Sequence, residues 1–418
     1  VGNFNTNGFV TLVSNATQTA LIDGSGNGEV LGSVNIQRYL PSGFGYKYIS
    51  SPVAGATVNQ FSDDLNLAAS FPTFYRYVEN VASTGWEDYI VPANTLTTMS
   101  GYAGNFGTAT TAKTIDMQGV VNNHLKSISL QNNNRPFTLG FNLVGNPFPS
   151  PINWDAASGW NRVNIDNAIY YFDAGTVNQY TGTYSSYING ISSNGIASGI
   201  IPAMQGFFVH VTNGTFPVNG LLQVDNPART THLQPVFHRT ASDPSLALIR
   251  LELLYSGSSG LSDAFTVYYD QQADEIFNCE NDALKLMNTD NDVPSIYTLS
   301  SDRVRLSINS LPGSPGDLPV IPVGLRCEKS GDVTLRVSEL QNIPDHLNIY
   351  FTDSEKRTNF NLRTASEFTF KAESGTFENR FRILFTEKEL PLVSDIDQFA
   401  VYAYQGTIYI YHDVEPGK

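Results

Sequence analysis

Hydrophobic residues in this chain recur at alternate positions within short runs, and glycine, asparagine, proline and aspartate interrupt these runs. Residues 34–40 and 74–79 are clear examples. A period of two residues places alternate side chains on one face of a strand, so these runs predict β-strands. Helical periodicity is almost absent, and its best candidate, residues 282–286, would make one or two turns at most. The pattern therefore predicts an all-β protein.

Polar, turn-rich residues 224–232 divide the chain into two strand-rich segments. Strands of about six residues alternate with turns before this division, and about seven short strands after it fit one β-sandwich or jelly roll. Beyond Pro391 the composition changes again, and residues 399–411 have the pattern of a hairpin. We therefore predict two β-sandwich-like or jelly-roll-like domains in tandem, plus the start of a small C-terminal β-domain. The predicted domains span residues 1–231, 232–388 and 389–418.

Residues 140–155, with the sequence GFNLVGNPFPSPINWD, form the most distinctive stretch of the chain. An apolar strand leads into Gly145 and Asn146, which tolerate left-handed backbone, and then into prolines at 147, 149 and 151. Each proline disfavours helix in the residue before it, so the backbone stays extended. No catalytic mechanism requires this spacing. We expect a rigid, buried corner with an architectural role, ending in a short turn that contains Trp154.

The composition fits an extracellular β-protein. Hydrophobic residues make up 41% of the 418 residues and aromatic residues 12%, which is enough for packed cores. Charged residues reach only 15%, so the polar surface consists mainly of Asn, Thr, Ser, Gln and Gly. The formal net charge of −15 argues against binding to nucleic acid or to an anionic membrane surface. No apolar run reaches the roughly 18 residues that a transmembrane helix needs.

The corner also shows a resemblance to a known group of proteins. GFNLVGNPFPSPINWD is similar to the GWNLVGNPYPSPIDW signature of large secreted proteins of the Bacteroidota, which the type IX secretion system exports. Other segments resemble further motifs of that group and follow in the same order. They are residues 34–41, 46–53, 201–209, 263–269, 281–286 and 380–385.

This resemblance implies a secreted cargo protein, adhesin-like, on the outer face of the outer membrane, with adhesion and gliding motility as the associated processes. Residues 389–418 resemble the first hairpin of a type-A sorting domain, the C-terminal secretion signal of such cargo, which would continue past Lys418. The implied partners are the type IX translocon and its shuttle and attachment components, and edge-strand pairing is the expected means of contact. The positions that match the hairpin are Phe399, Val401, Tyr402, Gly406, Ile408 and Ile410.

The two cysteines, Cys279 and Cys327, lie in the second predicted domain beside apolar segments. In an oxidising compartment such a pair favours a disulfide, and two buried thiols are the alternative. A bond would close a loop of about 48 residues and would stabilise the fold by roughly 4 kcal/mol.

No catalytic motif is evident, so we expect a protein that is not an enzyme. The six histidines are scattered without metal-ligand spacing, and neither HExxH nor G-x-S-x-G occurs. Residues 288–292 offer alternating oxygen ligands, as calcium loops do, but lack the glycine and distal glutamate of an EF-hand. We expect a solvated acidic turn there. A Ca²⁺ site at Asp290 and Asp292 is the alternative, and no other cofactor is expected.

Aromatic side chains indicate where a ligand would bind. Trp154 is expected in the core, whereas other rings are candidates for stacking on sugars. These candidates are Trp86, Tyr180, Tyr184 and Tyr187. The favoured hypothesis is an adhesin or structural surface module. The alternatives are a carbohydrate-binding module attached to or acting beside a glycosidase, and a hydrolase with two carboxylates distant in sequence.

Overall fold

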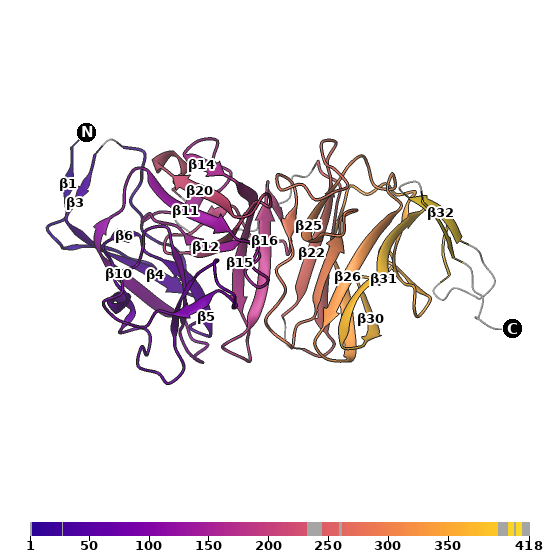
Figure 1. The fold of residues 1–418 in the computed structure, drawn as a ribbon, viewed down its shortest axis with the longest axis horizontal. Coiled ribbons are helices and arrows are strands. Elements are labelled where there is room, and N and C mark those ends of the chain that lie inside the picture. The colour runs from indigo at the N-terminus through magenta and orange to yellow at the C-terminus, as the bar shows by residue number, and fades with distance from the viewer. Residues whose placement is uncertain are drawn as a thin grey trace. The chain divides into compact units, whose positions relative to one another are not determined.

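The computed structural model describes residues 2–26, 28–231, 245–258 and 261–391, together with the strand backbones of residues 400–404 and 407–411. Strand accounts for 48% of the described residues and helix for 2%, and no helix among them reaches seven residues. The all-β prediction is therefore confirmed. The chain divides into two compact units, residues 1–240 and 241–418, which Figure 1 colours from indigo to pink and from orange to yellow.

Two four-stranded sheets of the first unit share a hydrophobic core. The first has the order β2 (Val10–Leu12), β4 (Ser33–Leu40), β10 (Lys113–Val121) and β6 (Val53–Ala54). The second has the order β5 (Tyr46–Ser50), β9 (Gly101–Asn105), β7 (Phe74–Tyr77) and β8 (Trp86–Asp88). Burial alternates along the whole of β4, so Val34 and Ile36 face the core, as the alternating sequence requires. Phe74 and Tyr102 from the second sheet belong to the same core.

Two further sheets of the first unit enclose a second core. One has the order β12 (Phe141–Gly145), β19 (Gly206–Val211), β15 (Ile165–Ala174), β16 (Gly182–Ile188) and β17 (Ile191–Ser192). The other has the order β11 (Lys126–Asn132), β20 (Val218–Val224) and β14 (Trp160–Val163). Every residue of β12 and β19 is buried, so both faces of these strands are covered.

Short elements complete the first unit. They are β1 (Phe4–Asn5) paired with β3 (Val30–Leu31), β13 (Ile152–Asn153) paired with β18 (Ile200–Ile201), and the 3₁₀ turns η1 (Val58–Phe61) and η2 (Asn226–Ala228).

The proline-rich corner follows β12 and is buried, as expected. Asn146 is fully buried, and its Nδ2 donates to the carbonyl oxygens of Ser150, Ile201 and Pro202 at 2.8, 3.1 and 3.0 Å. A Cβ added at Gly145 would lie 2.2 Å from Ser50 Cβ, so this position admits only glycine without a shift of the backbone. The corner is thus fixed by side-chain hydrogen bonds and by a close approach between strands.

Arg229 ties the end of the first unit to this corner. Its Nε donates to Ser150 Oγ at 2.8 Å, and its guanidinium lies 4.9 Å from the centre of the Phe148 ring. Its Nη1 donates to the side-chain oxygens of Asn123 and Asn226, both at 3.2 Å. A charged group that is tied by several hydrogen bonds holds the local geometry more firmly than neutral contacts do.

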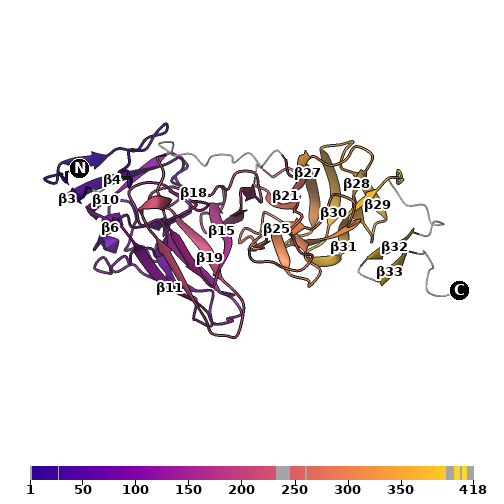
Figure 2. The same ribbon diagram turned by 90° about the horizontal axis from the view of Figure 1, so that it is seen from above.

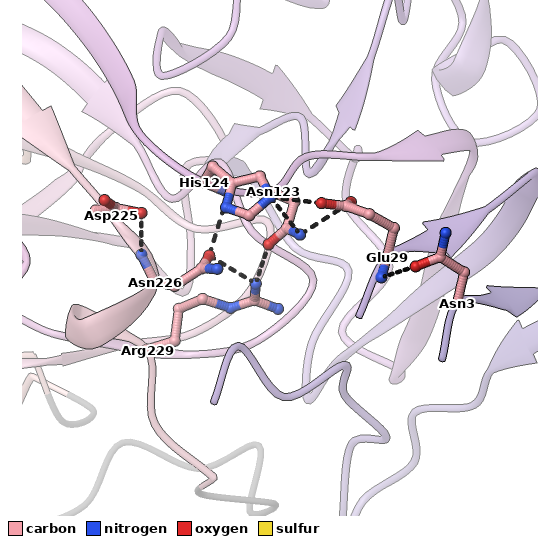
Figure 3. Close-up of polar contacts among 7 residues, drawn as sticks. All are labelled: Asn3, Glu29, Asn123, His124, Asp225, Asn226 and Arg229. Carbon is pink, nitrogen blue, oxygen red and sulfur yellow. Dashed lines mark hydrogen bonds and ion pairs between the residues drawn. The ribbon is translucent and has the colours of Figure 1, made fainter. Parts of the chain in front are cut away.

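The beginning of the chain joins the same set of contacts (Figure 3). His124 Nε2 lies 2.5 Å from Glu29 Oε1, and Asn123 Nδ2 donates to Glu29 Oε2 at 3.1 Å. The backbone amide of Glu29 donates to Asn3 Oδ1 at 2.9 Å. Segments that are distant in sequence therefore meet beside the corner.

Eleven strands of the second unit form one sheet. Ten follow the order β29 (Thr358–Asn361), β28 (Asn348–Asp353), β31 (Gly375–Thr386), β26 (Val320–Cys327), β24 (Ser295–Leu299), β25 (Arg305–Leu311), β22 (Asp263–Tyr269), β21 (Leu248–Tyr255), β27 (Gly331–Gln341) and β30 (Glu367–Ala372). The eleventh, β23 (Ala283–Leu284), pairs with β25.

This sheet curves back on itself. The rings of Phe360 on β29 and Phe368 on β30 lie 5.1 Å apart, although these strands are at opposite ends of the sheet order. Figure 2 shows the strands wrapped around one interior. Side chains from most strands of the sheet form a single hydrophobic core there. Closure of this kind leaves few unpaired strand edges.

The helical turn predicted for residues 282–286 is wrong. Ala283 and Leu284 form β23, and the side chains of the flanking Asp282 and Lys285 make buried hydrogen bonds. A segment this short gains more from strand pairing and burial than from its own helical propensity.

The C-terminal hairpin is described only as backbone. β32 (Ala400–Tyr404) and β33 (Thr407–Tyr411) pair antiparallel, with Val401 opposite Ile410, Tyr402 opposite Tyr409 and Ala403 opposite Ile408. Phe399 and Gly406 lie outside the described residues. The role of this hairpin as a secretion signal stays a prediction.

Candidate functional site

An aromatic cluster joins two sheets of the first unit. We define it by Tyr48 on β5, Tyr77 on β7, Trp86 on β8, Phe172 on β15, Tyr184 on β16 and Phe208 on β19. The Tyr48 ring stacks on Phe172 at 5.0 Å between centroids and meets Phe208 edge-to-face at 5.5 Å. The Tyr77 ring meets Trp86 at 5.0 Å. These geometries are the ones that aromatic pairs prefer.

Strand alternation explains why these rings meet. Tyr46 and Tyr48 are two residues apart on β5, and Tyr75 and Tyr77 are two apart on β7, so each pair shares a face. Ala103 on β9 pairs with both Tyr48 and Tyr75, and its small side chain leaves room for the larger rings. The sequence therefore places four tyrosines on one face of the sheet.

Burial keeps the phenols of the cluster protonated. The pKa of Tyr184 is raised to about 12 because burial disfavours the charged phenolate, and burial also raises the pKa of Tyr48. The two hydroxyl groups lie 3.0 Å apart and share a hydrogen bond. At neutral pH these groups act as hydrogen-bond donors and acceptors, not as bases.

A row of rings borders this cluster, and we call it the aromatic rim: the exposed Phe71 and Tyr180 and the half-buried Tyr46 and Tyr75. Phe71 and Tyr180 are 53% and 47% exposed and meet edge-to-face at 5.0 Å. Tyr46 lies 6.4 Å from Tyr180 and 6.1 Å from Tyr75, and both Tyr46 and Tyr75 are half-buried. The rim is a continuous apolar surface that also presents phenol hydroxyls.

Hydrogen bonds hold Tyr180 in place within the loop between β15 and β16. The Tyr180 amide donates to Asn178 Oδ1 at 3.0 Å, and the Gly175 amide donates to the Thr181 carbonyl at 2.7 Å. Asn105 Nδ2 donates to the Gln179 carbonyl at 3.4 Å, which ties the loop to β9. A ring on a fixed loop loses little conformational entropy when a ligand binds.

The structure separates the four ring candidates predicted from sequence. Tyr180 lies on the exposed rim, whereas Trp86 and Tyr184 are half-buried in the cluster. Tyr187 is wrong as a candidate for stacking on a sugar, because this ring is 2% exposed and its hydroxyl donates to Asp155. Tyr184 and Tyr187 are three residues apart on one strand, so they point to opposite faces.

Three rim residues, Phe71, Tyr46 and Tyr75, were missed by the sequence analysis. The alternation of Tyr46 with Tyr48 and of Tyr75 with Tyr77 was visible and could have indicated a shared tyrosine face. Phe71 had no such signal, because it lies in a loop whose position depends on the fold.

The acidic turn proposed as a calcium alternative has internal partners. The Asp292 amide donates to Asp290 Oδ1 at 2.9 Å, and Lys329 Nζ lies 2.5 Å from Asp292 Oδ1. Asp290 is 6% exposed, whereas the Asp292 side chain is 61% exposed, so only Asp292 is solvated as expected. Across the described ranges, no group of three or more His, Cys, Asp or Glu side chains is arranged to hold a metal ion. A Ca²⁺ site here stays a prediction.

The two cysteines are not bonded to each other, contrary to the expected disulfide. Cys279 is half-buried in the loop before β23, whereas Cys327 ends β26 inside the core beside Tyr255. Burial raises the pKa of the Cys327 thiol to about 11. Strand pairing therefore places Cys327 in the core as a buried thiol. This is the alternative to a disulfide that the sequence left open.

The fold and the aromatic site define an all-β protein of two units with an exposed ring surface on the first. Residues 2–385 match the sequence model of a family described as a domain of unknown function, DUF8693. The chain therefore belongs to this family. No curated protein and no solved structure matches it. The described residues include no helix long and apolar enough to cross a membrane.

Proposed function

We propose that this protein is a secreted surface module of adhesin type that binds glycan chains through the aromatic rim, without catalysis. The observation that supports this proposal is the exposed contact between Phe71 and Tyr180, backed by Tyr46. Exposed apolar patches with polar borders mark interaction sites. Sugar rings offer C–H faces to aromatic rings and hydroxyl groups to phenols, so this surface suits them.

A purely structural role is the competing proposal, and the same binding experiment separates the two. The full chain is applied to a glycan array, and binding to the strongest hits is then measured by isothermal titration calorimetry. Tyr180→Ala and Phe71→Ala each remove an exposed ring, so each should weaken binding by about tenfold. Trp86→Ala is less informative, because this ring packs on Tyr48 and Tyr77 and its loss would disturb the fold.

Val177→Ala is the matched control, because Val177 is an exposed apolar residue, 78% accessible, in the same loop as Tyr180. Its affinity should equal that of the wild type. An array without any bound glycan would favour the structural role. Glycan binding that survives both ring substitutions would place the site elsewhere.

Export by the type IX secretion system is part of the same proposal. It is supported by the ordered series of motifs and by the pairing of β32 with β33, which fits the first hairpin of a sorting domain. Deletion of residues 389–418 from the full-length protein should retain it inside the cell envelope, as measured by fractionation and immunoblotting. Undiminished export after this deletion would refute this part of the proposal.

A further inference from the structure

A groove of about 710 Å³ lies in the first unit, and none of the four rim residues lines it. Its walls come from β7, β9, β11, β12 and β20. This volume falls within the range of sites that enclose small-molecule ligands. The groove is therefore a second candidate site, independent of the aromatic rim.

Both charged side chains that line the groove, Arg76 and Glu79, are already held by hydrogen bonds from or to neighbouring residues. Arg76 Nε and Nη2 donate to Glu87 Oε2 at 2.9 and 2.7 Å, and its guanidinium lies 5.2 Å from the centre of the Tyr89 ring. Glu79 is 5% exposed and accepts from Asn133 N and Nδ2 at 3.1 and 2.6 Å. Arg76, the cation of the lining, is neutralised by Glu87, so it is not free to bind a phosphate or a carboxylate. The Glu79 carboxylate is buried, and its hydrogen bonds to neutral groups leave little of it for an ammonium group.

Side-chain amides and hydroxyls supply most of its polar lining. Gln131 on β11 and Asn219 on β20 are opposite each other in register, both are exposed, and Gln131 Nε2 donates to Asn219 Oδ1 at 3.3 Å. Ser129 lies two residues before Gln131 on the same face of β11. Each amide offers both donors and acceptors, which matches neighbouring sugar hydroxyls that donate and accept at once.

Apolar groups complete the lining. Leu143 is 5% exposed and contributes apolar surface. The rings of Tyr89 and Tyr102 stack at 5.6 Å, and Tyr102 stacks in turn on the buried Phe74 at 5.5 Å. This ring stack is anchored in the core, so the wall that it forms is rigid before any ligand arrives.

We propose that this groove binds a short neutral oligosaccharide. Its amides and hydroxyls bond to the sugar hydroxyls, and its apolar groups pack against the C–H faces of the sugar rings. An anionic ligand would need an unpaired cation, but Arg76, the cation of the lining, is already paired with Glu87. A cationic ligand would have to reach the Glu79 carboxylate, which is 5% exposed. An extended peptide is the other ligand class that a groove between strands could accept, and the experiment below distinguishes it.

Isothermal titration calorimetry on the full chain tests the proposal with five probes. They are the neutral tetrasaccharides of glucose, xylose and mannose, the acidic tetragalacturonate, and the peptide tetra-alanine. At least one neutral tetrasaccharide should bind. Asn219→Ala and Gln131→Ala should each weaken that binding by about tenfold, because each removes hydrogen bonds to the ligand.

Gln223→Ala is the matched control, because Gln223 lies on the same face of β20 as Asn219 and also pairs with an amide, Asn161, at 2.6 Å. It lies outside the groove lining, so its affinity should be unchanged. Tyr180→Ala should also leave this binding intact, which separates the groove from the rim. The proposal is overturned if no neutral tetrasaccharide binds, if tetragalacturonate or tetra-alanine binds better, or if both groove substitutions leave the affinity unchanged.

Discussion

Lys285 Nζ donates to both carboxylate oxygens of Asp263, at 2.5 and 2.6 Å, inside the second unit. Both side chains are only 1% exposed. The backbone amide of Ile296 also donates to Asp263 Oδ2, at 2.7 Å. Burial raises the pKa of Asp263, and the contacts with Lys285 and the Ile296 amide offset part of that rise. Two segments that resemble a family signature in sequence thus meet as one buried ion pair.

Removal of one partner from this pair should destabilise the second unit strongly. Lys285→Met leaves the Asp263 carboxylate buried without its counter-ion, so we expect a loss of about 3–5 kcal/mol. Urea unfolding followed by circular dichroism measures it. All three tryptophans, at 86, 154 and 160, belong to the first unit, so tryptophan fluorescence should report an unchanged midpoint there.

Arg336→Ala is the control, because Arg336 forms an ion pair with Glu367 whose two side chains are 41% and 54% exposed. Exposed pairs contribute about 0–1 kcal/mol, so this variant should unfold almost like the wild type. An equal effect of Lys285→Met and Arg336→Ala would show that the buried pair has no special energetic role.

The free energy of unfolding of the second unit should fall as the pH rises from about 4 to 6, because the buried Asp282 carboxyl loses its proton over this range. Burial raises the pKa of Asp282 to about 6, above its ordinary value of 3.8. A group whose pKa is raised by folding stabilises the fold below its unfolded pKa, and this contribution is lost as the pH passes the folded pKa. A shift of about two pKa units corresponds to about 3 kcal/mol.

Asp282→Asn removes this titration. The difference between its unfolding free energy and that of the wild type should therefore increase by about 3 kcal/mol, in favour of the variant, from pH 4 to pH 7. Urea unfolding at several pH values, followed by circular dichroism, measures the difference. Thr364→Ala is the control, since Thr364 is exposed and has no titratable side chain, so its difference from the wild type should not vary with pH. A pH-independent difference for Asp282→Asn would contradict the prediction.

The sequence was sufficient for features that depend on local pattern. The alternating residues of β4 predicted both the strand and the face of it that is buried, because burial along a strand has a period of two residues. Gly145, Asn146 and the prolines indicated a rigid, buried corner from their backbone preferences alone.

Features that depend on pairing between distant segments could not be predicted. The motif residues Asp263, Lys285 and Arg380 were noticed, but their ion pairs were not, because strands that are distant in the chain bring the partners together. Arg380 Nη2 lies 2.6 Å from Asp353 Oδ2, for example, and the two residues come from separate strands. The groove has five contributing strands, so no spacing in the sequence indicates it.

Asn146 provides the most direct test of the proline-rich corner. Its Nδ2 donates to three carbonyl oxygens, and its Oδ1 accepts from the Phe148 amide at 2.9 Å. Asn146→Asp keeps the shape but replaces the donor with an oxygen that faces those carbonyl oxygens. Each buried polar group that loses its partner costs about 1–3 kcal/mol, so the first unit should lose about 3–5 kcal/mol in total.

Tryptophan fluorescence during urea unfolding measures this loss, because Trp154 is fully buried and Trp160 packs against it at 4.8 Å. Asn161→Asp is the matched control: its side chain lies on an exposed strand position and bonds only to the side chain of Gln223 among the contacts described. It should change the unfolding free energy by less than about 1 kcal/mol. If Asn146→Asp stays within the same limit, the corner is held by its prolines and not by Asn146, because backbone stiffness alone would then account for its geometry.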